Sequence, residues 1–283
     1  MIRKNVLSLL LLLLPGIGFL LLTFGLPLWW ALTGSIGLGP GGVGFTFDHL
    51  AMIFERPAYW RGLQMSLYYA ITPTVLTLFI AVPLALLLQQ PMFGRKLLNG
   101  LYKIPLAVPG IIAAFMVLTM VEQGGFLDRI LMHVGLRMPR IVRDEWGIAV
   151  VLTSIWKDTP FMALIITGAF GAIASDMVPA ARSLGASRLR AFLAIELPMA
   201  MPGITAAALL CFVKSLGSFA APSILGPTYP MPLPVLMYES YREGKWAEIY
   251  AMGTVLIIAA FLVLAAYYTL TALSLRPGRE SRQ

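Results

Sequence analysis

The sequence is poor in charged residues and contains a single cysteine. Only 12% of its 283 residues are Asp, Glu, Lys or Arg, whereas 59% are hydrophobic, and the mean hydropathy is +0.83. A soluble globular domain has about 25% charged and about 45–50% apolar residues. The composition therefore predicts an integral membrane protein. Cys211 cannot form a disulfide within the chain, so it does not indicate a redox compartment.

Residues that several chemistries require are also scarce. No G-x-x-x-x-G-K-[ST] phosphate-binding loop occurs, so we do not expect this chain to hydrolyse ATP. The only two histidines, His49 and His133, lie far apart, and each is expected to be an exposed side chain rather than a ligand. A membrane enzyme would need converging acid, base or metal-binding groups. Because none is recognisable, we expect no catalytic residue, no metal and no cofactor on this chain.

Six apolar segments are long enough to cross a bilayer, which takes about 20 helical residues. They cover residues 6–32, 63–90, 104–122, 147–171, 199–222 and 249–274. The first is longer than the apolar region of a signal peptide, about 7–15 residues, and is predicted to be an uncleaved span. The alternating segments of a membrane β-barrel are missing. We therefore predict an all-α, polytopic helical bundle that forms one transmembrane domain over residues 1–283.

Lysine and arginine residues outside these segments indicate the orientation. The two termini and the loops near 91–103 and 172–198 hold eleven basic and three acidic residues, whereas the other three loops hold eight of each. The basic residues of the first set are Arg3, Lys4, Arg95, Lys96, Lys103, Arg182, Arg188, Arg190, Arg276, Arg279 and Arg282. Cytoplasmic loops carry an excess of Lys and Arg, so both termini and these two loops are predicted to be cytoplasmic. No basic stripe with interleaved aromatic residues is present, and nucleic acid is not an expected partner.

The loop 172–198 combines helix-like spacing with residues that begin and end helices. It predicts two short helices joined at Gly185, because glycine readily adopts the left-handed conformation that ends a helix. The expected caps and breaks are Ser175 or Asp176 before the first helix, Pro179 in its first turn, Ser187 before the second helix, and Pro198 and Pro202 at its end. A basic loop that only fixes the topology is the alternative, and spacing alone leaves both open.

The same loop resembles the signature of binding-protein-dependent permeases of ATP-binding-cassette (ABC) importers. The pattern is Ala-Ala-x-x-x-Gly, nine residues, then Ile-x-Leu-Pro, and it is formed by Ala180, Ala181, Gly185, Ile195, Leu197 and Pro198. Pro179 stands where that signature usually begins with glutamate. The first span and the stretches MSLYYAITPTVLTLFIAVPLALLL, WKDTPFMALII and SLGSFAAPSILG also resemble this family, so the likeness covers nearly the whole chain. It implies the type I importer permease fold and a multi-pass protein of the bacterial inner membrane.

The resemblance implies that the loop is a coupling helix that docks in a cleft of a cytoplasmic ATPase subunit. The elbow would be Gly185, with Leu184, Leu189 and Phe192 as an apolar anchor. The residues assigned to coupling are Ala180, Ala181, Arg182, Leu184, Gly185, Ala186, Ser187, Arg188, Ile195, Leu197 and Pro198. The implied partners are two ATP-binding subunits that use ATP and Mg²⁺, a second homologous permease or a second copy, a periplasmic or lipid-anchored solute-binding protein, and membrane lipid.

Charged residues inside the apolar segments are candidates for the solute path, because charges in a bilayer are costly. Glu122 lies at a span end and is expected at the interface. The candidates for the path are Trp156, Lys157, Asp158, Lys214, Ser215, Ser218 and Phe219. For the pair in WKDTPF, a local ion pair or a contact with a neighbouring subunit is the alternative to a lining of the path.

The substrate is less constrained than the transport mechanism. The stretches ARSLGAS and SLGSFAAPSILG resemble permeases of the polyamine, iron and phosphonate branch, whereas WKDTPFMALII resembles the sugar branch. A polyamine such as spermidine or putrescine is the leading expectation, with sugars, opines and phosphonates as alternatives. A secondary transporter driven by an ion gradient is the rival class, and the internal repeats that such proteins show are not recognisable here.

Overall fold

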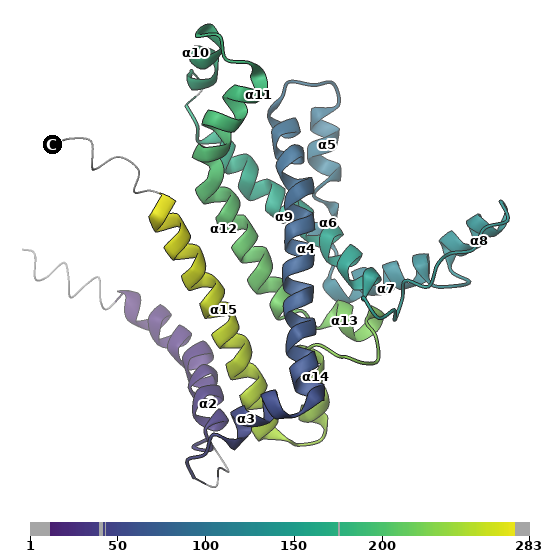
Figure 1. Cartoon of the computed structure of the whole chain (residues 1–283), viewed down its shortest axis with the longest axis vertical. Coiled ribbons are helices and arrows are strands. Elements are labelled where there is room, and N and C mark those ends of the chain that lie inside the picture. Colours follow the sequence, from purple (N-terminus) through teal and green to yellow (C-terminus); the bar gives the residue numbers. More distant parts are fainter. Residues whose placement is uncertain (1–11, 40–41, 43, 175, 275–283) are drawn as a thin grey trace, which may run out of the picture. The chain divides into compact units, whose positions relative to one another are not determined.

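The computed structural model describes residues 12–39, 42, 44–174 and 176–274, and all regular structure within them is helical (Figure 1). The predicted all-α fold class is confirmed. After a helical stretch over residues 12–20, the elements are η1 Leu21–Gly25, α2 Leu26–Ser35, α3 Asp48–Glu55, α4 Pro57–Gln89, α5 Arg95–Leu101, α6 Ile104–Ala107, α7 Gly110–Val121, α8 Phe126–Met132, α9 Ile148–Gly171, α10 Met177–Ser183, α11 Arg188–Ala191, η2 Phe192–Glu196, α12 Leu197–Leu216, α13 Ala220–Leu225, α14 Leu233–Arg242 and α15 Trp246–Ser274. The elements η1 and η2 are π-helical turns.

The described residues contain six helical stretches that are long and apolar enough to cross a membrane, which confirms the predicted number. They are Leu12–Ser35, Pro57–Gln89, Gly110–Met132, Ile148–Gly171, Arg188–Leu216 and Trp246–Thr269. Residues 6–11 of the first predicted span, and Arg3, Lys4, Arg276, Arg279 and Arg282, lie outside the described residues.

The helix bounds differ from the predicted spans where proline or glycine interrupts the backbone. The segment 104–122 is divided at Pro109, because Val108 is extended (ψ 120°) as residues before proline prefer. The segment 199–222 is divided after Leu216, and α13 then begins at Ala220. Both breaks place backbone groups at the cavity described below.

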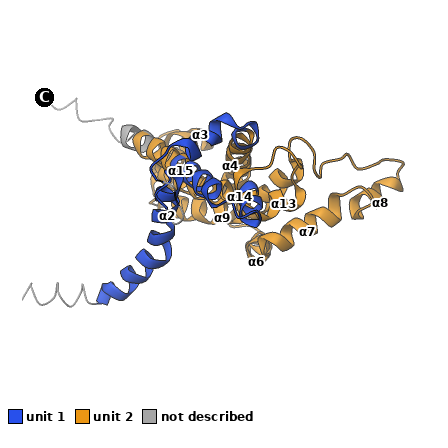
Figure 2. Ribbon diagram, turned by 90° about the horizontal axis from the view of Figure 1, so that it is seen from below, with its two compact units in different colours: residues 1–60, 236–258 blue, residues 61–235, 259–283 orange. Residues whose placement is uncertain are grey.

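The chain forms two compact units (Figure 2): residues 1–60 with 236–258, and residues 61–235 with 259–283. The assignment of residues 1–283 to one permease domain stays a prediction.

In the first unit, Glu248 binds three other side chains. Its carboxylate accepts hydrogen bonds from Tyr59 Oη (2.6 Å) and Ser240 Oγ (3.1 Å) and pairs with Arg56 (3.2 Å). These bonds tie the starts of α4 and α15 to α14.

The second unit has its main core between α4, α9 and α12. Small side chains dominate this core, which lets helices approach closely in a membrane protein. Its buried residues are Ala81, Ala85, Met162, Ala163, Ile166, Phe170, Ala200, Ile204, Ala207 and Cys211. A hypothetical Cβ on Gly203 of α12 would lie 2.3 Å from the Cβ of Ala169 on α9. The two helices that carry the loop 172–198 are therefore packed tightly against each other.

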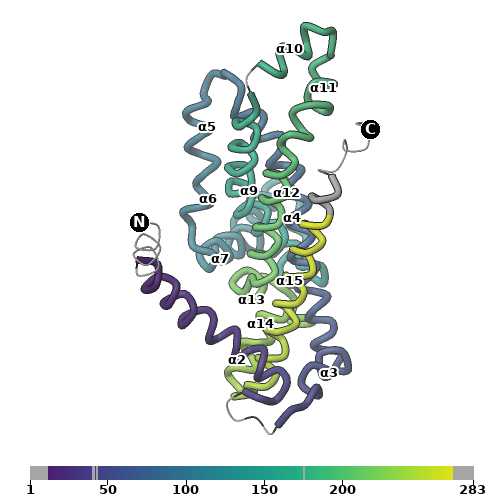
Figure 3. The backbone as a smooth tube through the Cα atoms, turned by 90° about the vertical axis from the view of Figure 1, so that its left-hand side faces the viewer, coloured from purple at the N-terminus to yellow at the C-terminus, as the bar shows by residue number. Residues whose placement is uncertain are grey.

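The two loops that were predicted to be cytoplasmic lie at the same end of the second unit. The segment around α5 and the segment with α10 and α11 both extend from this end (Figures 1 and 3). This agrees with the pairing of the loops by charge. Which side of the membrane this end faces stays a prediction.

Candidate functional site

A polar cavity of about 100 Å³ lies inside the second unit, beside the breaks after Val108 and Leu216. It is lined by Gly110, Thr153, Ser154, Lys157, Asp158, Lys214, Ser215, Ser218, Ala220 and Ala221. Of the seven residues predicted for the solute path, this cavity brings five together. The other two, Trp156 and Phe219, do not line it, and each side chain is 37% exposed.

Asp158 is the buried centre of this cavity, with only 3% of its surface exposed. One carboxylate oxygen pairs with the ammonium of Lys214, and the other accepts a hydrogen bond from Ser215 Oγ at 3.1 Å. Lys214 itself is 52% exposed at its side chain. The sequence left a local ion pair and a lining of the path as alternatives. The structure shows an ion pair of Asp158 with Lys214, and the lining of the solute path stays a prediction. The pair joins α9 to α12 within the bilayer-crossing stretches.

Lys157, the neighbour of Asp158, points to a different element. Its ammonium donates hydrogen bonds to the carbonyl oxygens of Pro105 (3.0 Å) and Val108. These carbonyls lie at the break between α6 and α7. Lys157 therefore binds backbone rather than a carboxylate, which its position in WKDTPF did not reveal.

Sequence reasoning missed several lining residues, although two of them carried a usable signal. Thr153 and Ser154 lie four and three residues before Lys157, which places them on the same helix face. Gly110, Ala220 and Ala221 gave no such signal. They reach the cavity because the chain breaks before α7 and α13, and these breaks depend on the packing of the helices.

The loop 172–198 forms the predicted helix–elbow–helix. Gly185 has φ +90°, its N–H bonds to Arg182 O (3.0 Å), and the N–H of Ala186 bonds to Ala181 O (3.1 Å). This pair of bonds is a Schellman motif, which ends a helix with a left-handed residue. Ser187 Oγ accepts a hydrogen bond from Arg190 N at 3.3 Å and caps α11, as predicted.

Position 179 explains why the first helix has no side-chain cap. Asp176 occupies the cap position of α10 without a capping hydrogen bond, and Ser175 lies outside the described residues. In a capping box, the cap side chain bonds to the third N–H of the helix, and a glutamate there bonds back to the cap residue. Pro179 is the third residue of α10 and has neither group. It costs little in the first turn, where the N–H has no helical partner.

The predicted end of the second helix is wrong. Pro198 and Pro202 do not end it: the helix continues from Arg188 to Leu216, and the π-helical turn η2 ends at Glu196, two residues before Pro198. The wider turn avoids the clash that a proline ring makes with the carbonyl four residues earlier in an α-helix. Phe192, assigned to the apolar anchor, is partly buried against the core, and its ring lies 6.3 Å from that of Phe170; its place in the anchor stays a prediction.

The other coupling candidates lie on or near the surface of this loop. Leu184 is 90% exposed and Leu189 is 67% exposed. The exposed members of the set are Ala180, Arg182, Leu184, Gly185, Ser187, Arg188 and Pro198, and the half-buried members are Ala181, Ala186, Ile195 and Leu197. The elbow therefore presents a large apolar side chain at its tip.

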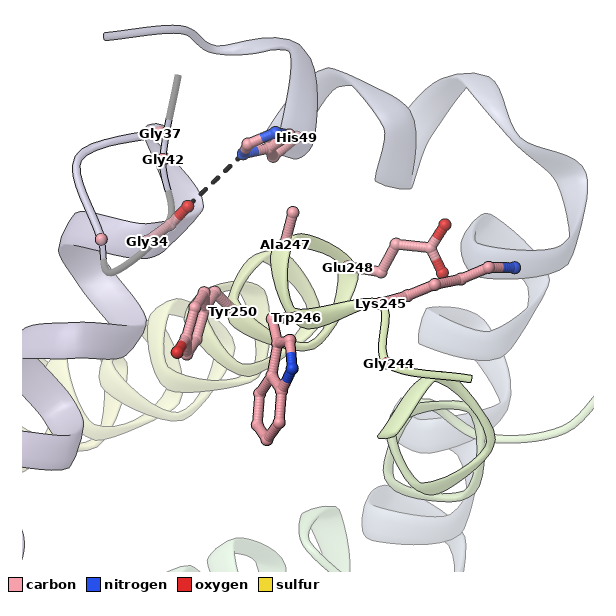
Figure 4. A pocket seen from close by; sticks show the side chains of 11 residues that line it. Gly34, Gly37, Gly42, His49, Gly244, Lys245, Trp246, Ala247, Glu248 and Tyr250 are labelled. Atoms are coloured by element: carbon pink, nitrogen blue, oxygen red, sulfur yellow. Dashed lines mark hydrogen bonds between the residues drawn. The ribbon is translucent and has the colours of Figure 1, made fainter. Parts of the chain in front are cut away.

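A second cavity, of about 470 Å³, lies within the first unit (Figure 4). His49 and Tyr250 line it together with five glycines, and His49 Nδ1 lies 3.4 Å from Gly34 O. His49 is half-buried, so the expectation of an exposed side chain is wrong for it, whereas His133 is exposed as expected. A Cβ on Gly34 would lie 2.2 Å from the Tyr250 ring, so this wall requires glycine. Across the described part of the chain, no group of three or more His, Cys, Asp or Glu residues could hold a metal ion.

Six stretches able to cross a membrane, a cavity lined by charged and hydroxyl side chains in the second unit, and an exposed helical elbow are features expected of a membrane permease. Residues 77–276 match the family described as binding-protein-dependent transport system inner membrane component. This match covers well over half of the sequence, and the chain belongs to this family. It is therefore a multi-pass inner-membrane component of an ABC importer, in a family of transport subunits rather than enzymes.

Curated relatives transport different solutes. The chain is 29% identical over 208 residues to a probable molybdenum ABC transporter permease of Haloferax volcanii, covering 72% of this chain and 74% of that protein. It is 26% identical over 226 residues to the spermidine/putrescine permease PotB of Escherichia coli, covering 79% and 82%. It is also 26% identical over 242 residues to the trehalose/maltose permease MalF of Thermococcus litoralis, covering 83% and 79%.

Solved structures confirm the importer permease fold. A chain of a bacterial alginate ABC transporter, in complex with an alginate-bound periplasmic protein, superposes with a TM-score of 0.81 at 20% identity and covers 97% of both chains. A chain of the MetNI methionine ABC transporter has a TM-score of 0.61 at 20% identity and covers 78% of this chain and 99% of its own. At these identities the likeness concerns the fold alone.

Proposed function

We propose that this chain forms the solute pathway of an ATP-driven importer and that the loop 172–198 docks on a separate ATP-binding subunit. The observation that carries this proposal is the exposed tip of the loop, where Leu184 stands 90% exposed on a helical elbow. Leu189 and Leu193 of the same loop are also exposed, at 67% and 52%, and groups of exposed apolar side chains mark sites of interaction. The helices that carry this elbow, α9 and α12, extend to the cavity around Asp158, so a tilt of the elbow would be passed to the cavity.

The assembly that we propose contains further subunits. Two ATP-binding subunits would use ATP and Mg²⁺, this chain would bind no cofactor itself, and a second homologous permease or a second copy would complete the path. A periplasmic or lipid-anchored solute-binding protein would deliver the solute, and lipid would surround the spans. The alginate transporter was solved with its periplasmic protein, which supports this kind of partner. Both termini would be cytoplasmic, as the distribution of Lys and Arg favours.

The outer side would receive the solute-binding protein. The glycine-walled cavity of the first unit is the candidate contact, because Trp246 at its edge is 51% exposed and Tyr250 lines it. Aromatic side chains are enriched in protein interfaces. This cavity includes part of the proline- and aromatic-rich segment 226–251, which the assigned topology places outside.

The coupling role is tested with Gly185→Asp in the assembled importer. Aspartate at φ +90° strains the Schellman turn and adds charge to the elbow. We expect unchanged membrane insertion and loss of solute-stimulated ATP hydrolysis. The matched control is Gly100→Asp, which adds the same charge to α5, where nothing lies within 4 Å of a new Cβ. Full stimulation in Gly185→Asp would contradict the coupling role.

For the substrate, a polyamine such as spermidine or putrescine is the first candidate. Support comes from PotB, which is 26% identical, and from the chemistry of the cavity. An ammonium group of the solute can replace Lys214 on the Asp158 carboxylate, because the Lys214 side chain is 52% exposed and free to turn to water. The incoming ammonium would keep the buried carboxylate paired.

A small oxyanion is the second candidate, and the charge of the cavity favours it. The charged residues of the lining are Lys157, Lys214 and Asp158, so it carries one more positive than negative charge. The 29% identical relative is a probable molybdenum permease. Calorimetry of the cognate solute-binding protein with spermidine, molybdate and maltose would distinguish the classes. Binding of spermidine alone supports the first candidate, molybdate alone supports the second, and maltose alone would contradict both.

A further inference from the structure

The break between α6 and α7 leaves backbone carbonyl groups without helical partners. In a continuous α-helix, the carbonyl of Pro105 would accept a hydrogen bond from the N–H of residue 109, but Pro109 has no N–H. The first bond of α7 runs from Ala113 N to Pro109 O at 2.9 Å, so the Val108 carbonyl also lies outside the helix. Unpaired carbonyls are costly where water is excluded.

Lys157 meets both of these carbonyls. From α9 its ammonium donates one hydrogen bond to Pro105 O at 3.0 Å and another to Val108 O. A cation at the carbonyl end of a helix is favourable because the partial charges of the peptide groups are negative there. The half-buried side chain thus replaces backbone hydrogen bonds that the proline removes.

This clamp lies at the wall of the cavity. Gly110, the first residue of α7, lines the cavity beside Asp158 and Ser154. The chain reaches Gly110 directly through Val108 and Pro109, so the anchorage of Val108 to α9 sets where the wall begins. These two carbonyls use two of the three N–H donors of the lysine ammonium, so most of its hydrogen-bonding capacity is spent on backbone.

We infer that Lys157 is a positioning residue whose ammonium closes the proline break and fixes the start of α7 at the cavity. Its main role is to hold this wall of the solute path. The inference rests on the proposed function only in treating the cavity as part of the path.

The test uses hydrogen exchange of the purified full chain with three variants. Lys157→Met keeps the length of the side chain but removes the ammonium, and we expect protection of the amides in residues 110–116 to fall about tenfold. The second variant combines Lys157→Met with Pro109→Ala, which supplies an N–H for the Pro105 carbonyl. This double variant is therefore expected to recover most of the protection. The third variant, Lys157→Arg, keeps a charged donor, and its protection should lie between that of the unmodified chain and that of Lys157→Met. Lys96→Met on the exposed face of α5 is the control.

Each outcome decides the inference. Unchanged exchange in Lys157→Met, a double variant no better than Lys157→Met, or an equal loss across α4 and α15 would overturn it. If Lys157→Met cannot be recovered folded, recovery of the double variant supports the inference and loss of both overturns it. These measurements need neither solute nor ATP, so they stand whatever the importer carries.

A transport readout separates positioning from plain stabilisation. In the assembled importer, the solute moved per ATP hydrolysed is expected to fall about threefold in Lys157→Met and to recover in the double variant. An unchanged ratio with altered exchange would show a structural clamp without a role in transport. Failure of ATP stimulation in the unmodified importer would instead contradict the proposed function.

Discussion

The side chains at the two ends of the α9–α12 pair differ in whether they have partners within this chain. At the cavity, Lys214 and Ser215 both bind Asp158, and Lys157 binds backbone carbonyls. At the elbow, Leu184 is 90% exposed on a turn that is held by the two backbone hydrogen bonds of the Schellman motif. The polar groups at the cavity have partners within this chain, whereas the elbow has a hydrogen-bonded backbone and an exposed apolar side chain. The difference indicates that changes at the cavity act on folding, and changes at the elbow act on assembly.

The largest effect on stability is expected from Lys214→Met. This change leaves the Asp158 side chain, 4% exposed, as a buried carboxylate with only Ser215 as a partner. Removal of one partner of a buried ion pair costs about 3–5 kcal/mol, and we expect about 3 kcal/mol because Ser215 remains. Asp158→Asn leaves the lysine able to reach water and should cost about 1 kcal/mol. Chemical unfolding of the purified chain in detergent measures both.

Two further variants test the expected difference in cost between Lys214→Met and Asp158→Asn. Lys96→Met removes an exposed lysine from α5 and should leave the free energy of unfolding unchanged. The double variant Asp158→Asn/Lys214→Met removes both charges and should recover most of the loss, because no buried charge remains. Equal losses for the two single variants would show that the burial of Asp158 does not set the cost.

A smaller effect is expected from Gly203→Ala, at the contact that joins the two helices. The new Cβ would lie 2.3 Å from the Cβ of Ala169, and overpacking of this kind costs about 1–3 kcal/mol. Ala169→Gly removes the opposing atom, so the exchange Ala169→Gly/Gly203→Ala should restore stability. Gly168→Ala, one residue away on α9, meets nothing within 4 Å and is the matched control. A loss in the control as large as in Gly203→Ala would contradict the close-contact explanation.

Features that depend on residues close together in the sequence could be predicted, whereas contacts between distant residues could not. The elbow at Gly185 and the Ser187 cap depend on residues within three or four positions, and both were predictable. The pairing of Asp158 with Lys214 joins residues 56 positions apart. Periodicity identifies the buried face of a helix but not the helix that it faces. The charged residues were therefore recognised as unusual, while their partners were not.

The effect of a proline on its helix also depends on contacts that the local sequence does not specify. Pro198 was expected to end a helix, as the local rule states. The helix instead continues through a π-helical turn, because packing against α9 holds both sides of the proline in place. Pro109 does break its helix, and there Lys157 from α9 binds the freed carbonyls. The outcome at each proline was decided by a neighbouring helix, which local sequence does not specify.

The smallest effect on the chain itself is expected at the tip of the elbow. Leu184→Ser removes a side chain that is already 90% exposed, so the free energy of unfolding should change by less than about 0.5 kcal/mol. In the assembled importer the same change should weaken the binding of the ATP-binding subunit by more than about tenfold, since full burial of a leucine side chain contributes about 1.5–3 kcal/mol. Leu101→Ser, on α5 and 51% exposed, is the control for loss of an exposed leucine from the same end of the unit. Co-purification and ATP hydrolysis measure the outcome. If the variant stays fully assembled, Leu184 is not part of the docking surface. If the variant unfolds, the elbow belongs to the core of the chain.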